Sequence, residues 1–128
     1  MDLNLLRRTA RDRVKVDLVM KGVGIFREEI GAEIRFNMAG IKECINQPFN
    51  PYRDKLLLLL DGLEEALANA VYIGFTTYQT HPKEHVAGYH YFETAIGGKT
   101  AYFNIQVTVQ NRCFLYSITE TLHWDFSE

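Results

Sequence analysis

One predicted hairpin, residues 89–109, constrains the fold of this chain more than any other segment. Two alternating runs flank Gly97 and Gly98, and Gly-Gly is a favoured two-residue turn because both central positions need a positive φ. In this register His90 faces Ile105. One face is then apolar, with Phe92, Ile96, Ala101, Phe103, Ile105, Val107 and Val109, and the other is polar and aromatic, with Tyr89, Tyr91, Glu93, Tyr102, Asn104 and Gln106. We expect the apolar face to cover a core and the polar face to contact a ligand.

Two further strands extend this sheet. The alternating run over residues 70–78 predicts a strand before the hairpin. After it, Asn111 and Arg112 are interpreted as a second two-residue turn, followed by a strand over residues 113–119. This register pairs Tyr116 with Val107 on the apolar face, whereas Ser117 and Thr119 join the polar face, opposite Gln106 and Asn104.

Helical patterns dominate the first half of the chain. Residues 2–20 carry an apolar stripe, Leu3, Leu6, Ala10, Val14 and Leu18, with basic residues on the other sides, Arg7, Arg8, Arg11, Arg13 and Lys15. That basic side is either a solvated face or an electrostatic footprint for phosphate. Residues 32–36 fit a short edge strand, and Asn37 is expected to cap a helix over residues 38–46.

A leucine-rich helix is predicted from Pro51 to about Ala68, with Asn50 as its N-cap. Leucines surround most of its middle, so it is expected to lie between layers or in a dimer. The predicted fold is α+β, with N-terminal helices packed on one face of a four-stranded antiparallel meander sheet. The proposed division is an N-terminal helical arm (1–31), the main domain (32–122) and a tail (123–128).

Composition excludes several classes of protein. A chain of 128 residues suits one domain with a genuine core, and its net charge of -2 gives no global attraction to nucleic acid. The longest apolar run, residues 56–60, is too short for a membrane span, and the N-terminus lacks a secretory pattern, so we expect a cytoplasmic protein without membrane contact. Cys44 and Cys113 are expected to be buried free thiols. No cofactor fingerprint is present.

The histidines and tyrosines leave alternatives open. Pro82 lies between His81 and His85, which argues against a helix presenting both to one metal ion, so no metal site is predicted. His85 lies in a loop beside the sheet, where it could transfer protons. His90 is either a core histidine or is turned outward by a bulge near Gly88. The tyrosines of the polar face either stack on bases or simply stabilise the sheet.

Short motifs in a definite order carry a family resemblance. They are Gly40-Ile41-Lys42, Ile45-Asn46-Gln47-Pro48, Tyr52 with Lys55, Asn69-Ala70 with Tyr72-Ile73-Gly74, His85, His90-Tyr91-Phe92, Ile96-Gly97-Gly98-Lys99 and Leu115-Tyr116-Ser117-Ile118. Over residues 34–122 the chain resembles domains of large polyvalent proteins of phages and conjugative elements. Those domains are assigned to the Barnase, EndoU, colicin and RelE-like nuclease superfamily.

The resemblance implies a helix pair followed by a four-stranded antiparallel sheet, and a metal-independent, toxin-like ribonuclease that needs no cofactor. It implies His85 or His90 as acid or base, Lys42 on the phosphate, and Tyr116 or Ser117 as a hydrogen-bond donor. RNA is the expected partner, on the polar face formed by Tyr89, Tyr91, Tyr102, Asn104, Gln106 and Thr119. The alternative is a non-catalytic interaction domain. It would use the same face for RNA or protein, or form a homodimer through the leucine-rich helix or the N-terminal arm.

Overall fold

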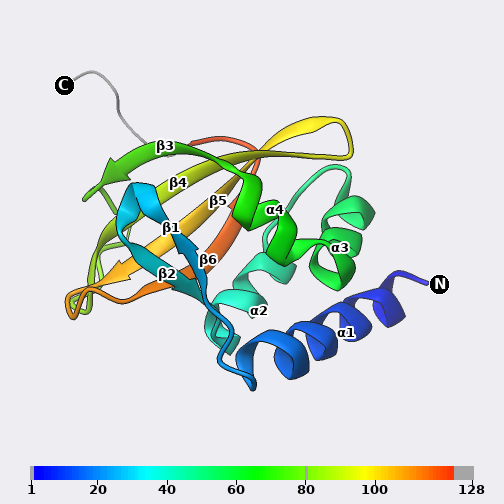
Figure 1. Cartoon of the computed structure of the whole chain (residues 1–128). Coiled ribbons are helices and arrows are strands. Elements are labelled where there is room, and N and C mark those ends of the chain that lie inside the picture. The colour runs from blue at the N-terminus through cyan, green and yellow to red at the C-terminus, as the bar shows by residue number, and fades with distance from the viewer. Residues whose placement is uncertain (1, 80, 123–128) are drawn as a thin grey trace.

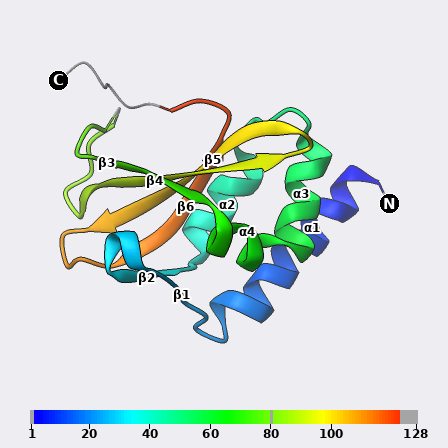
Figure 2. The same ribbon diagram turned by 45° about the horizontal axis from the view of Figure 1, so that its top comes forward.

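The computed structural model describes residues 2–79 and 81–122, so the predicted tail lies outside the described residues. The helices gather on one side of a curled sheet, with α1 farthest from it (Figure 1, Figure 2). They are α1 (Leu3–Val14), which continues as the π-helical turn η1 (Lys15–Val19), then α2 (Met38–Asn46), α3 (Tyr52–Asp61) and α4 (Leu63–Asn69). The strands are β1 (Ile25–Arg27), β2 (Ala32–Arg35), β3 (Val71–Thr76), β4 (Val86–Ile96), β5 (Lys99–Thr108) and β6 (Cys113–Thr119), and the 3-10 turn η2 (Glu28–Ile30) joins β1 to β2. The α+β class is confirmed.

Among the described residues the sheet has six strands in the order β1-β2-β6-β5-β4-β3. The predicted four-stranded antiparallel meander corresponds to β3–β6 and is therefore incomplete. β2 pairs with β6 in parallel, with Ile34 beside Cys113, and β1 pairs antiparallel with β2. Sequence patterns missed this pairing because β1 and β2 are short and no local turn joins β2 to β6.

The central hairpin has the predicted register. Gly97 and Gly98 have φ values of 59° and 74°, as a two-residue turn requires, and His90 pairs with Ile105. A Cβ atom on Gly97 would lie 2.3 Å from Oδ2 of Asp54, so the turn packs directly against α3. The apolar face of the hairpin is buried from Phe92 to Val107.

The register between β5 and β6 differs from the prediction. The turn begins at Thr108, whose amide donates to the carbonyl of Arg112, so Val107 pairs with Cys113. Val109 is consequently exposed instead of joining the apolar face. A bulge at Tyr116 then shifts the pairing.

Because of this bulge, Ser117 pairs with Asn104 and Thr119 with Tyr102. The predicted pairing of Tyr116 with Val107 is wrong, as are the predicted partners of Ser117 and Thr119. Ser117 and Thr119 nonetheless lie opposite residues of the polar face. The early turn moves the register by three residues, from Tyr116 to Cys113 opposite Val107, and the bulge moves it back by one. The net shift of two keeps Ser117 and Thr119 on the predicted face, because side chains in a strand alternate with a period of two.

The first helix is part of the same hydrophobic core as the sheet. Its stripe of Leu6, Ala10, Val14 and Leu18 is buried in one cluster with residues of α2, α3, α4 and the strands. Asn37 caps α2 as predicted, because its Oδ1 accepts a hydrogen bond from the amide of Gly40 at 2.8 Å. Residues before Ala32 therefore contribute directly to the packing of the main domain.

The predicted leucine-rich helix is broken at Gly62 into α3 and α4. Pro51 occupies the N-cap of α3 and Tyr52 its first helical position, one residue later than predicted. Most leucines of the segment are buried or half-buried, whereas Leu57 is exposed. The segment thus lies between layers of this chain, as one of the two sequence alternatives expects.

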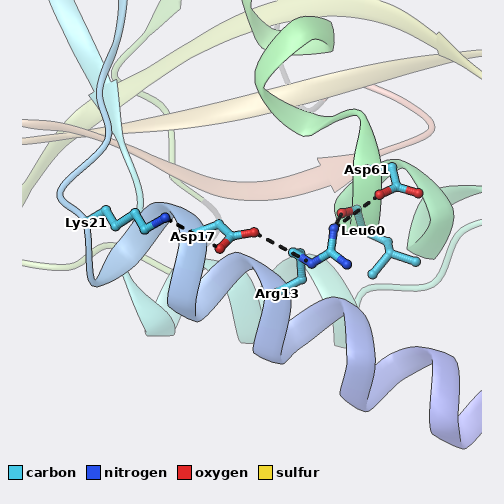
Figure 3. A network of polar contacts seen from close by, with 5 residues as sticks. All are labelled: Arg13, Asp17, Lys21, Leu60 and Asp61. Carbon is cyan, nitrogen blue, oxygen red and sulfur yellow. Dashed lines mark hydrogen bonds and ion pairs between the residues drawn. The ribbon is translucent and has the colours of Figure 1, made fainter.

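Polar contacts fasten the end of α1 to the end of α3. Arg13 Nη1 lies 3.3 Å from Asp61 Oδ1 and donates a long hydrogen bond to the carbonyl of Leu60, and Arg13 Nε lies 3.6 Å from Asp17 (Figure 3). Lys21 extends the network to Asp17. These contacts are solvent-exposed, so they orient the helices but contribute little free energy of unfolding.

Of the described residues, no helix combines the length and apolarity needed to cross a membrane. Cys44 and Cys113 are free and buried, as predicted. Within residues 2–79 and 81–122, no three His, Cys, Asp or Glu side chains are grouped to hold a metal ion.

Candidate functional site: a tyrosine-lined groove

The polar face of the sheet carries a groove of about 310 Å³, here called the polar groove. Its floor consists of strands β4–β6, one wall is α2, and the other wall is the loop between β3 and β4. The lining residues are Glu43, Gln47, Tyr78, Gln79, His81, Lys83, Tyr89, Tyr91, Asn104, Tyr116, Ser117 and Thr119. The groove thus combines tyrosine rings, hydroxyls and amides with one carboxylate, one imidazole and one ammonium group.

Hydrogen bonds within the sheet hold the floor in place. Asn104 is buried, and its Nδ2 donates to Thr119 Oγ1 at 3.0 Å and to the carbonyl of Ser117 at 3.3 Å. The ring of Tyr89 lies 5.8 Å from that of Tyr116, and Gln106 Nε2 donates to the Tyr89 hydroxyl. Because these polar groups are satisfied within the sheet, the rings are presented on a fixed surface.

The side chain of Gln79 forms hydrogen bonds across the β3–β4 loop. Gln79 donates through Nε2 to the carbonyl of Val86 and accepts through Oε1 from the amide of Lys83. Lys83 Nζ in turn donates to the Tyr116 hydroxyl at 3.2 Å and lies 4.9 Å from the centre of that ring. The loop therefore places a cation over the groove floor, with exposed His81 on the same wall.

Close packing of α2 against β6 builds the opposite wall. A Cβ atom on Gly40 would lie 2.0 Å from the carbonyl oxygen of Leu115, so only glycine allows this approach. Glu43 and Gln47 lie about one and two helical turns after Gly40, and both line the groove. The hydrogen bond to Tyr116 raises the pKa of Lys83, and the negative charge of Glu43 adds to this shift. Glu43 and Lys83 thus interact electrostatically across the groove.

Six of the predicted site residues line the polar groove, namely Tyr89, Tyr91, Asn104, Tyr116, Ser117 and Thr119. The early turn accounts for Tyr116, since it pairs Leu115 with Ile105 on the apolar face and so places the next residue, Tyr116, on the polar face. The bulge then brings Ser117 opposite Asn104 on the same face. Gln106 supports the groove through Tyr89. Tyr102 is half-buried on β5 and is not a lining residue.

His90 lies on the other face of the sheet from the groove. Its Nδ1 is 2.9 Å from the Tyr72 hydroxyl, and its ring packs 4.8 Å from that of Phe75. Burial lowers the pKa of His90, which favours the neutral imidazole. A bulge does occur next to Gly88, but it precedes His90 and leaves its pairing with Ile105 intact.

The other two predicted groups also lie outside the groove. His85 is exposed in the loop just before β4, and its carbonyl accepts a hydrogen bond from the amide of Val109. Lys42 is exposed on α2, in a separate concavity with arginines of α1. The structure therefore does not bring Lys42, His85 and His90 together with Tyr116 and Ser117.

Sequence reasoning missed the titratable groups on both walls, Glu43, His81 and Lys83. Glu43 and Gln47 are four residues apart on a capped helix, so they share one side of it. His81 and Lys83 belong to the connection that leads into the central hairpin. This loop could have been recognised as a border of the polar face, but the position of α2 depends on the non-local contact between Gly40 and Leu115.

A comparison with known families finds a match, over residues 1–114, to large polyvalent protein-associated domain 3. The chain belongs to this family. The match to this polyvalent protein-associated domain covers both walls of the groove and the floor residues on β4 and β5, and ends before Tyr116. No curated protein and no solved structure matches the chain.

Proposed function

We propose that this polyvalent protein-associated domain is a metal-independent ribonuclease of a phage or conjugative element, and that it belongs to the nuclease superfamily named above. One observation carries the proposal: Glu43 and His81 lie on opposite walls of a groove whose floor holds Lys83 against Tyr116. A carboxylate, an imidazole and a cation on one surface are the groups that RNA cleavage by transesterification requires.

In the proposed reaction, Glu43 accepts the proton of a ribose 2′-hydroxyl. The 2′-oxygen then attacks the adjacent phosphorus, and the bond from phosphorus to the 5′-oxygen breaks. The imidazolium of His81 donates its proton to this leaving oxygen, which gives a 2′,3′-cyclic phosphate and a free 5′-hydroxyl. No oxidant, reductant or second substrate is needed.

Lys83 is the group that would neutralise charge on the phosphate. Hydrogen bonding to Tyr116 raises its pKa, so it carries its proton at neutral pH. The hydroxyls of Tyr116 and Ser117 are donors beside it in the same groove. The rings of Tyr89 and Tyr116 supply faces on which bases can stack whatever their sequence.

The test is cleavage of a fluorescently labelled single-stranded RNA in EDTA. We expect wild type to cut it, and His81→Ala and Glu43→Gln each to reduce the rate by about 100-fold or more. His85→Ala is the matched control, because it removes another exposed imidazole from the same loop but outside the groove. An RNA with 2′-deoxyribose at the cut site should resist cleavage.

A non-catalytic RNA-binding domain is the second candidate, favoured by the number of tyrosines in the groove, since stacking needs no acid or base. RNA that binds to wild type in EDTA but stays intact would support this function and exclude the ribonuclease. Cleavage that survives unchanged in both His81→Ala and Glu43→Gln would show that the activity does not belong to these residues.

A further inference from the structure

A second concavity lies between α1 and α2, and we propose that it binds the phosphate backbone of a nucleic-acid strand. Its volume is about 430 Å³, and it is lined by Asn4, Arg7, Arg8, Arg11, Lys42, Ile45 and Asn46. We call it the basic groove. The proposal concerns a surface separate from the polar groove and does not require that the domain cleave RNA.

The helix packing produces this groove. The buried stripe of α1 fixes the rotation of that helix, so its neighbouring flank with Arg7 and Arg11, four residues apart, borders α2. On α2, Lys42 and Asn46 are also one turn apart. Arg7 Nη2 donates to Asn46 Oδ1 at 2.9 Å, which joins the two sides of the groove.

Among the described residues, the lining carries four cationic side chains and no carboxylate, although the whole chain has a net charge of -2. Within the described part of the chain, Arg8 and Lys42 form no ion pair. Arg11 contacts Asp12 at 3.5 Å, but both side chains are exposed and such a pair is weak. The cations are therefore available to an anionic ligand.

The chemistry of the lining favours phosphodiesters over other ligands. Guanidinium groups match phosphate oxygens in a two-pronged geometry, and several cations in a row suit a polyanion. None of the described residues that line this groove is aromatic, so they offer no stacking surface for bases. We expect contacts to the backbone alone, which bind without regard to sequence and depend strongly on salt.

Its position relates this groove to the candidate site. α2 lines both concavities, with Glu43 and Gln47 on the polar groove and Lys42 and Asn46 on the basic groove. The basic flank of α1 and Lys42, which the sequence presents as separate features, thus form one surface. A strand held there would lie next to the helix that forms a wall of the polar groove.

The test is the salt dependence of binding to a labelled single-stranded DNA, which lacks the 2′-hydroxyl and cannot be cut by transesterification. The variant Arg8→Gln/Arg11→Gln/Lys42→Gln is compared with Lys15→Gln/Lys21→Gln/Arg112→Gln, which removes the same charge from exposed positions outside the groove. With about 0.7 counterions released per contact, we expect the first variant to lower the slope of log K against log salt concentration by about 2. Its affinity at low salt should fall by about tenfold or more, and the control should keep the wild-type slope.

Equal slopes for the two triple variants, or no DNA binding by wild type, would overturn the proposal. Tight binding of polyglutamate that is lost in the same variant, with DNA unaffected, would assign the groove to an acidic protein instead. Circular dichroism checks folding, and if the triple variant does not fold, Lys42→Gln alone should lower the slope by about 0.7. Failure of the ribonuclease proposal appears separately, as RNA that wild type leaves intact, or as cleavage that persists unchanged in both His81→Ala and Glu43→Gln.

Discussion

The ammonium group of Lys55 donates a hydrogen bond to the carbonyl oxygen of Gln47, the C-cap residue of α2. Lys55 is completely buried, and its Nζ lies 5.2 Å from the centre of the Tyr52 ring. Gln47 also lines the polar groove. A buried cation in α3 therefore fixes the end of the helix that forms one wall of the candidate site, where a cation complements the helix dipole.

The burial of Lys55 should make the free energy of unfolding depend on pH. Desolvation lowers the pKa of Lys55 from 10.5 to about 8, with the thiol of Cys44 and the charge of Arg7 as smaller influences of opposite sign. Between these values the unfolded chain binds more protons than the folded one, so the free energy of unfolding rises with pH. We expect a rise from pH 8 to pH 9 of up to about 1.4 kcal/mol, measured by urea unfolding.

Above pH 9 Cys44 opposes any further rise, because burial raises the pKa of its thiol from 9.0 to about 12, and the unfolded chain then loses this proton before the folded chain does. Lys55→Met should abolish the rise between pH 8 and pH 9. Lys42→Met, on the exposed side of α2, should retain it. A rise of the same size in Lys55→Met would show that another group causes it.

The contact between Gly40 and Leu115 predicts the effect of a single methyl group. In Gly40→Ala the new Cβ would meet the Leu115 carbonyl at 2.0 Å, so α2 must move away from β6. We expect a loss of about 1–3 kcal/mol in the free energy of unfolding, as for overpacked cores. Gly62→Ala is the control, since its Cβ has nothing closer than 3.5 Å. Equal urea midpoints for the two variants would contradict this.

Local patterns predicted the elements that local interactions determine. The Gly97-Gly98 turn fixes the hairpin register, and the Asn37 side chain fixes the start of α2, and both features are visible within a few residues. The six-stranded order was not predictable, because β2 meets β6 through residues as far apart as Ile34 and Cys113. The break at Gly62 was overlooked because the leucine pattern continues on both sides of it.

The candidate site also has one part that local sequence patterns predict and another part that depends on contacts between distant residues. Its floor was largely predicted, since Tyr89, Tyr91 and Asn104 alternate along the hairpin with the period of a strand. Its walls were not, because Glu43 reaches the groove only through the packing of α2 on β6. The turn between β5 and β6 is longer than the two residues Asn111 and Arg112, and this length determines whether the Tyr116 ring faces the core or the groove.

The ring of Tyr116 should matter more for RNA binding than its hydroxyl. Tyr116→Ala removes the contact with Tyr89 and the surface under Lys83, and we expect about tenfold weaker binding, within the range known for lost base stacking. Tyr116→Phe keeps the ring and should bind more tightly than Tyr116→Ala. The control is Tyr102→Ala, from the same sheet but outside the groove lining. Fluorescence anisotropy with RNA measures all three, and equal losses in Tyr116→Ala and Tyr102→Ala would exclude the groove as the binding surface.

His90 should contribute to acid sensitivity and not to cleavage. Its neutral Nδ1 can accept the hydroxyl proton of Tyr72, and protonation would remove this acceptor inside a half-buried aromatic cluster. Because burial lowers the pKa of His90 below 6.5, the unfolded chain binds its proton first, and stability is lost as the pH falls through 6.5. Urea unfolding at pH 7 and pH 5 should therefore show a larger loss for wild type than for His90→Phe, whereas exposed His85→Ala should behave like wild type. If RNA cleavage is observed, His90→Phe should retain it, and a variant that folds normally but no longer cuts RNA would place His90 in the reaction after all.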